Sequence, residues 1–167
     1  MKISVLFVCL GNICRSPTAH GLFQYYVDQA NLADSILVDS AGTGRWHEGE
    51  APDSRAQLVA LNKGYDISHL RGRSVESNDF LSFDYMLAMD DQNLHFLENM
   101  KPDNYHGDLG LFLKIANNRV EDCSTDNKIM QVPDPFYGDS AHFEKAIALI
   151  DHGSKNLLAK IREKHDL

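Results

Sequence analysis

Hydrophobic positions in this chain alternate between short apolar runs and longer stretches in which apolar residues recur at helical spacing. The short runs, rich in β-branched and aromatic residues, predict buried strands at residues 3–8, 36–38, 83–89 and 109–112. The helical spacing predicts helices at residues 17–30, 56–62, 93–100 and, last, a long one from Phe143 to Ile161. Strands that alternate with helices predict an α/β fold: a doubly wound, four-stranded parallel sheet with helices on both faces. We expect one domain over residues 1–167.

The connection between the first strand and the first helix carries the most specific chemical pattern. It places Cys9 at the end of the strand, and Arg15, Ser16 and Pro17 at the start of the helix. Free backbone N–H groups and the positive end of the helix dipole make such a junction an anion site. We therefore predict a phosphate-binding loop made of Leu10, Gly11, Asn12, Ile13, Cys14, Arg15 and Ser16.

Three side chains of this loop have complementary chemistry. Helix N-termini and neighbouring cations favour the thiolate form of cysteine, which makes Cys9 the predicted nucleophile. The planar guanidinium of Arg15 matches two phosphate oxygens. The hydroxyl of Ser16 can donate to the sulfur. Gly11 and Asn12 tolerate the positive φ that a tight loop needs.

Composition limits the function classes. The 167 residues are 43% hydrophobic, and 16 basic against 24 acidic residues give a net charge of −8. This charge argues against a nucleic-acid or anionic-membrane partner, and no apolar segment is long enough to span a bilayer. Three cysteines suit a reducing compartment, so we expect a cytoplasmic protein. Cys9 and Cys14 lack a second ligand pair, so no metal site is predicted.

Four further segments, residues 39–43, 46–47, 88–90 and 133–138, follow the loop of residues 9–17 in order along essentially the whole chain. On these segments the sequence resembles the low-molecular-weight protein tyrosine phosphatases. The resemblance implies hydrolysis of phosphotyrosine through a phosphocysteine, without a cofactor. It also implies a phosphotyrosine-containing protein as substrate, and a monomer is favoured.

The resemblance also assigns roles to individual residues. Cys9 would be the nucleophile, Arg15 would bind the phosphoryl oxygens and Asp134 would be the general acid. Residues that would support the loop are Asn12, Ser16, Ser40 and His69. Residues that would wall the slot for the phosphorylated ring are Trp46, His47, Phe136 and Tyr137.

Three other functions fit parts of the pattern. Protein arginine phosphatases resemble this loop but carry a small polar residue where Ile13 stands. Arsenate reductases need further cysteines to relay a disulfide, and none occurs between Cys14 and Cys123. A phosphotyrosine-binding module without catalysis is disfavoured because Cys9, Arg15 and Asp134 are all present.

Two features leave alternatives open. Cys14 either forms a redox-sensitive disulfide with Cys9 or packs beneath the loop. The polar stretch Lys114–Gln131 is longer than expected for the family; it is either an inert surface excursion or a segment that shapes substrate access.

Overall fold

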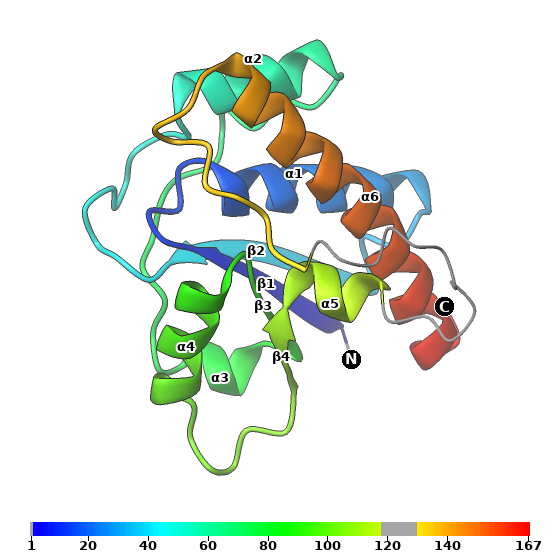
Figure 1. Ribbon diagram of the computed structural model, residues 1–167. Helices are drawn as coiled ribbons and strands as arrows, with labels where there is room; N and C mark the ends of the chain where they lie inside the picture. Colours follow the sequence, from blue (N-terminus) through cyan, green and yellow to red (C-terminus); the bar gives the residue numbers. More distant parts are fainter. Residues whose placement is uncertain (1, 118–129) are drawn as a thin grey trace.

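The computed structural model describes residues 2–117 and 130–167, and its centre is a parallel sheet with the strand order β2-β1-β3-β4 (Figure 1). The strands are β1 (Ile3–Cys9), β2 (Ile36–Gly42), β3 (Tyr85–Ala88) and β4 (Asp108–Leu111). In the register, Cys9 pairs with Gly42 on one side of β1, and Val8 pairs with Ala88 on the other. The predicted four-stranded parallel α/β sheet is confirmed.

Helices cover both faces of this sheet (Figure 1). Their bounds are α1 (Arg15–Gln29), α2 (Ser54–Asn62), α3 (Asp79–Ser82), α4 (Asp91–Met100), α5 (Phe112–Asn117) and α6 (Ser140–His165). Alternate residues of β1 enter two separate cores: Val5 and Phe7 pack with α1, α2, α5 and α6, whereas Leu6 and Val8 pack with α3 and α4. This alternation follows from the two-residue period of a strand.

Several predicted boundaries differ from the structure. The second strand continues to Gly42, and the third starts at Tyr85 because Phe83 closes helix α3. Phe112, predicted as strand, begins α5, so the polar stretch Lys114–Gln131 starts inside a helix. Short helices such as α3 and α5 carry too few residues to show a periodicity. Residues 118–129 of that stretch, with Cys123, lie outside the described residues.

The sheet brings three segments to one edge, at the carboxyl ends of β1, β2 and β3. The loop after β1 enters α1, the segment after β2 carries Trp46 and His47, and residues 130–139 cross the same edge before α6. Open α/β sheets bind their ligands at this edge. Within residues 2–117 and 130–167, no helix combines the length and the apolar character required to cross a bilayer.

Candidate active site

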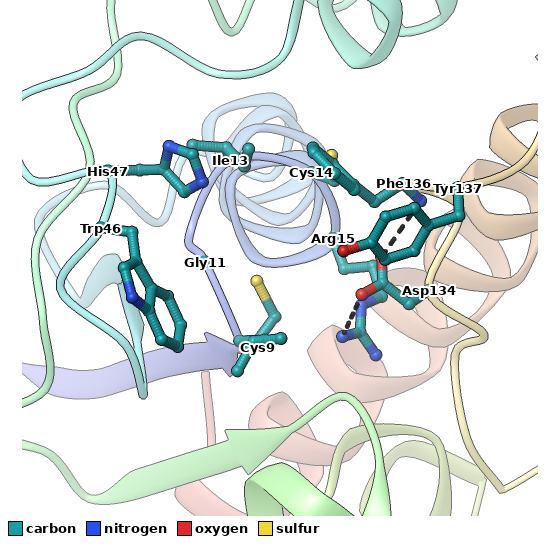
Figure 2. A pocket seen from close by; sticks show the side chains of 11 residues that line it. Cys9, Gly11, Ile13, Cys14, Arg15, Trp46, His47, Asp134, Phe136 and Tyr137 are labelled. Atoms are coloured by element: carbon teal, nitrogen blue, oxygen red, sulfur yellow. Dashed lines mark hydrogen bonds and ion pairs between the residues drawn. The ribbon is translucent and has the colours of Figure 1, made fainter.

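The loop after β1 wraps around the sulfur of Cys9 (Figure 2). The backbone N–H of Asn12 donates to Cys9 Sγ at 3.3 Å, and Ser16 Oγ lies 3.0 Å from the same sulfur. Both donors stabilise negative charge on sulfur. The side chain of Cys9 is buried, yet it lines an open cavity. The structure thus gives Cys9 the donors that a thiolate nucleophile needs.

Asn12 holds the shape of the loop. Its Nδ2 donates to Ser16 Oγ at 2.8 Å, and its Oδ1 accepts from the backbone N–H of Arg73 at 3.0 Å. The positive φ predicted for the pair Gly11-Asn12 falls on Asn12 alone, at 55°. Gly11 has a different reason to be small: a Cβ there would lie 3.2 Å from the ring of His47.

Arg15 is almost fully buried, and hydrogen bonds to Asp90 and Val132 hold its guanidinium in place. Its Nη1 donates to Asp90 Oδ2 at 2.6 Å and to the carbonyl of Val132 at 3.0 Å, and its side chain is 2% exposed. Burial acts to lower the pKa of Arg15, but the nearby negative charges of Cys9 and two carboxylates outweigh it, so the pKa is raised. The guanidinium is therefore a permanent cation at the floor of the site.

Asp90 was not assigned a role from the sequence, although it stands in a motif of the resemblance. It caps α4 by accepting from the N–H of Asn93 at 2.8 Å with Oδ1, while Oδ2 holds Arg15. The signal that could have found it is an acidic residue directly after a buried strand, at the sheet edge that carries the loop.

Asp134 approaches Arg15 from the segment before α6 (Figure 2). Its Oδ2 lies 3.4 Å from Arg15 Nη2, and its Oδ1 accepts from the backbone N–H of Phe136 at 3.2 Å. The carboxyl group is partly exposed and lines the same cavity as Cys9. The structure therefore brings together the nucleophile, the cation and the acid that the sequence predicted.

The cavity above Cys9 has a volume of about 290 Å³. Its lining residues are Cys9, Leu10, Gly11, Ile13, Cys14, Arg15, Trp46, His47, Asp134, Phe136 and Tyr137. Trp46, 71% exposed, and Tyr137, 94% exposed, stand on opposite sides of the opening (Figure 2). Aromatic faces on two sides of an anion site form a slot that suits a flat ring attached to a phosphoryl group.

Cys14 lies beside the cavity with its thiol free and buried. Burial, aided by the charge of Asp53, raises the pKa of the Cys14 thiol well above its ordinary value. Cys14 is thus held as a neutral thiol, and both alternatives for it, a redox-sensitive disulfide with Cys9 or packing beneath the loop, stay predictions.

Two of the predicted supporting residues, Ser40 and His69, both lie beside His20. Ser40 lies within β2, and its Oγ is 3.3 Å from His20 Nδ1. His69 and His20 line a second cavity of about 260 Å³, and among the hydrogen bonds of residues 2–117 and 130–167 none joins His69 to the loop. His20 was missed; burial lowers its pKa to about 4. Its position one helical turn after Ser16 was the available signal.

The described residues contain no group of three or more His, Cys, Asp or Glu side chains arranged to hold a metal ion. The cation of this site is Arg15 itself. The arrangement can bind a tetrahedral oxyanion, attack it with sulfur and move a proton through Asp134.

Comparison with known proteins gives a consistent result. The family model described as low molecular weight phosphotyrosine protein phosphatase matches residues 4–167. A protein of that name from Schizosaccharomyces pombe is 42% identical over 162 residues, covering 96% of this chain and 97% of the relative.

Two solved structures are close in fold. The protein tyrosine phosphatase from Entamoeba histolytica, with Hepes in its active site, superimposes with a TM-score of 0.87 at 36% identity, covering 98% of this chain and 99% of that one. An arginine phosphatase from Drosophila gives a TM-score of 0.82 at 32% identity, covering 97% and 98%.

Proposed function

This chain belongs to the low molecular weight phosphotyrosine protein phosphatase family, and we propose that Cys9, Arg15 and Asp134 carry out its reaction. The enzyme hydrolyses phosphotyrosine in proteins, and the match over residues 4–167 supports a single phosphatase domain. One observation supports these roles: the sulfur of Cys9, the guanidinium of Arg15 and the carboxyl group of Asp134 all line one cavity.

Substrate binding uses the loop and the two aromatic walls. The phosphoryl group lies in the loop, where backbone N–H groups and Arg15 neutralise its oxygens. The ring of the phosphotyrosine extends between Trp46 and Tyr137, which sets the depth at which phosphorus meets Cys9. A slot with aromatic side chains on two sides favours a flat aryl phosphate over a short alkyl phosphate.

In the first chemical step the thiolate of Cys9 attacks phosphorus. A P–S bond forms, the P–O bond to tyrosine breaks, and Asp134 transfers its proton to the departing phenolate oxygen. A positioned general acid contributes roughly 10²- to 10⁴-fold to such a step. Arg15 and the loop amides stabilise the charge on the phosphoryl oxygens in the transition state.

In the second step water hydrolyses the phosphocysteine. Asp134, now a carboxylate, accepts a proton from water as the new P–O bond forms and the P–S bond breaks. Ser16 stabilises the returning thiolate, because its hydroxyl lies 3.0 Å from the sulfur. The products are inorganic phosphate and the original enzyme.

Phosphate release from a phosphotyrosine peptide, with excess chelator and under reducing conditions, tests these roles. We expect no turnover by Cys9→Ser and slow residual turnover by Asp134→Ala. Wild-type rates in either variant would refute the assigned role. A chelator that stops the wild-type enzyme would refute a reaction supported by Arg15 in place of a metal.

A second candidate substrate is phosphoarginine, because a structural neighbour is named an arginine phosphatase. Ile13 lines the cavity and gives its wall an apolar surface, which favours an aryl ring over a guanidinium group. Parallel assays with phosphotyrosine and phosphoarginine peptides decide between them. We expect preference for phosphotyrosine in the wild type and a shift toward phosphoarginine in Ile13→Thr.

A further inference from the structure

Arg55 connects the phosphate loop to the segment before α6 that carries Asp134, although Arg55 itself does not line the cavity. It lies in the first turn of α2, and its Nη1 donates to the carbonyl of Phe136 at 3.0 Å. Its guanidinium carbon lies 5.3 Å from the centre of the Phe136 ring and 4.8 Å from that of Phe143. One side chain thus contacts both the backbone and the ring of Phe136.

Asp53 connects Arg55 to the phosphate loop. Its carboxylate accepts from Arg55 Nε at 3.0 Å and from Nη2 at 2.7 Å, a bidentate pair. Its backbone N–H donates to the carbonyl of Ile13 at 2.7 Å. The guanidinium is therefore oriented by a residue that is itself attached to the phosphate loop.

Phe136 completes the connection to the predicted acid. The same residue that offers its carbonyl to Arg55 offers its N–H to Asp134 Oδ1 at 3.2 Å. Asp134 in turn faces Arg15 of the phosphate loop at 3.4 Å. We call residues 134–136, which contain the predicted acid, the acid segment. The contacts form a closed ring from the phosphate loop through Asp53, Arg55 and the acid segment back to the phosphate loop.

We propose that Arg55 is a positioning residue that holds the acid segment at a fixed distance from the phosphate loop. The proposal rests on the proposed role of Asp134. Arg55 itself touches neither phosphorus nor the leaving group. A misplacement of about 1 Å in a reacting group can cost about 10²-fold in rate, so the effect of Arg55 appears in catalysis.

The surface position of Arg55 makes the proposal testable without unfolding the protein. Its side chain is 45% exposed, and exposed ion pairs contribute little to stability. Methionine has a similar helix propensity and can keep the apolar contact with Phe143. Arg55→Met therefore removes the guanidinium and keeps the fold intact. A thermal unfolding midpoint close to that of the wild type would verify this.

The readout is the dependence of kcat/KM on the leaving group. Phosphotyrosine releases a phenol with a pKa of about 10 and needs its oxygen protonated, whereas 2,4-dinitrophenyl phosphate releases a weakly basic phenolate that does not. We expect Arg55→Met to lower kcat/KM for a phosphotyrosine peptide about tenfold and to change it less than about twofold for the dinitrophenyl ester.

Two further variants separate the explanations. Lys63→Met removes an exposed cation directly after α2, which pairs with Glu144 of α6 at 3.4 Å, and this variant should behave as wild type. Asp134→Ala should show the same leaving-group pattern as Arg55→Met, but more strongly.

Three outcomes would overturn the proposal. Equal losses on both substrates in Arg55→Met would mean a general disturbance of the site, and no loss would mean that the ring of contacts is dispensable. Both would leave the role of Asp134 intact. Absence of leaving-group dependence in Asp134→Ala would overturn the acid assignment together with the role of Arg55.

Discussion

The contact between Arg15 and Asp90 can be tested by its effect on kcat/KM. If Asp90 positions Arg15, its replacement lowers kcat/KM, and if Asp90 only repels the anionic substrate, its replacement raises kcat/KM. Asp90→Asn keeps an oxygen that can cap α4 but removes the negative charge 2.6 Å from Arg15 Nη1. Asparagine is as good a helix cap as aspartate. Because the single amide oxygen stays on the cap, the NH2 group that replaces Oδ2 cannot accept from Arg15 Nη1. The substitution therefore removes the acceptor that holds Arg15 in place and keeps the cap of α4.

The size of the effect follows from the type of hydrogen bond. A hydrogen bond to a charged group contributes about 1.5–3 kcal/mol, and the substitution leaves none between residue 90 and Arg15, so the loss is about 1.5–3 kcal/mol. The carbonyl of Val132 keeps one contact with Arg15 Nη1, at 3.0 Å. The loosened guanidinium can then move toward Asp134, which already lies 3.4 Å from Nη2.

We expect Asp90→Asn to lower kcat/KM for a phosphotyrosine peptide about tenfold, equivalent to about 1.4 kcal/mol. Urea unfolding should show a loss of stability of about 1.5–3 kcal/mol. The matched control is Asp91→Asn, which makes the same charge change one residue later, where the carboxylate pairs with the exposed amide of Gln131 at 2.9 Å.

The refuting result has a clear meaning. If Asp90 acted only as an anion near an anion site, its removal would strengthen phosphate binding and raise kcat/KM. A rise, or equal behaviour of the Asp90 and Asp91 variants, would show that Asp90 does not position Arg15.

Other features predict separate outcomes. Asn12→Ala should cost about 2–3 kcal/mol in urea unfolding, because the N–H of Arg73 loses its acceptor and alanine must adopt the positive φ; unchanged stability would contradict the role of Asn12. Because the folded pKa of His20 is lowered to about 4, wild-type stability should be full above about pH 6.5 and fall by about 2–3 kcal/mol toward pH 4.5. His20→Gln should lack this part of the loss when the two proteins are unfolded at both pH values, and parallel curves would refute it. Trp46→Ala and Tyr137→Ala should each raise KM for aryl phosphates severalfold with little change for inorganic phosphate inhibition, and equal effects on both ligands would exclude a ring-binding slot.

The parts of the site predicted from sequence are those formed by contiguous residues. The phosphate loop is local: strand end, glycine, asparagine, arginine and helix start follow one another, so geometry and chemistry can be inferred together. Asp134 is different, because nothing local separates it from an ordinary turn aspartate between Pro133 and Pro135. Its role came from the family resemblance, and its position beside Arg15 came from the fold.

The contacts that the sequence did not reveal are tertiary. Asp90 meets Arg15 only because β3 and β1 are neighbours in the sheet. Arg55 meets Phe136 only because α2 packs beside α6. The place of Asp90 directly after a buried strand indicates the sheet edge where it lies, but no periodicity along the chain indicates that it contacts Arg15, or that Arg55 contacts Phe136. Likewise, the place of His20 one helical turn after Ser16 puts it near the loop but does not indicate its partner Ser40 on β2.

The central position of β1 in the sheet also sets the order in which this protein can acquire activity as it is synthesised. Cys9 leaves the ribosome before the strands that flank β1, because β1 pairs in parallel with residues 36–42 on one side and with residues 85–88 on the other. The acid segment and the α6 cover over α1 come later still. A nascent chain that lacks residues 132–165 therefore carries Cys9 without Asp134 and without the α6 cover over α1, and the long-range parallel pairing of β1 is slow in addition.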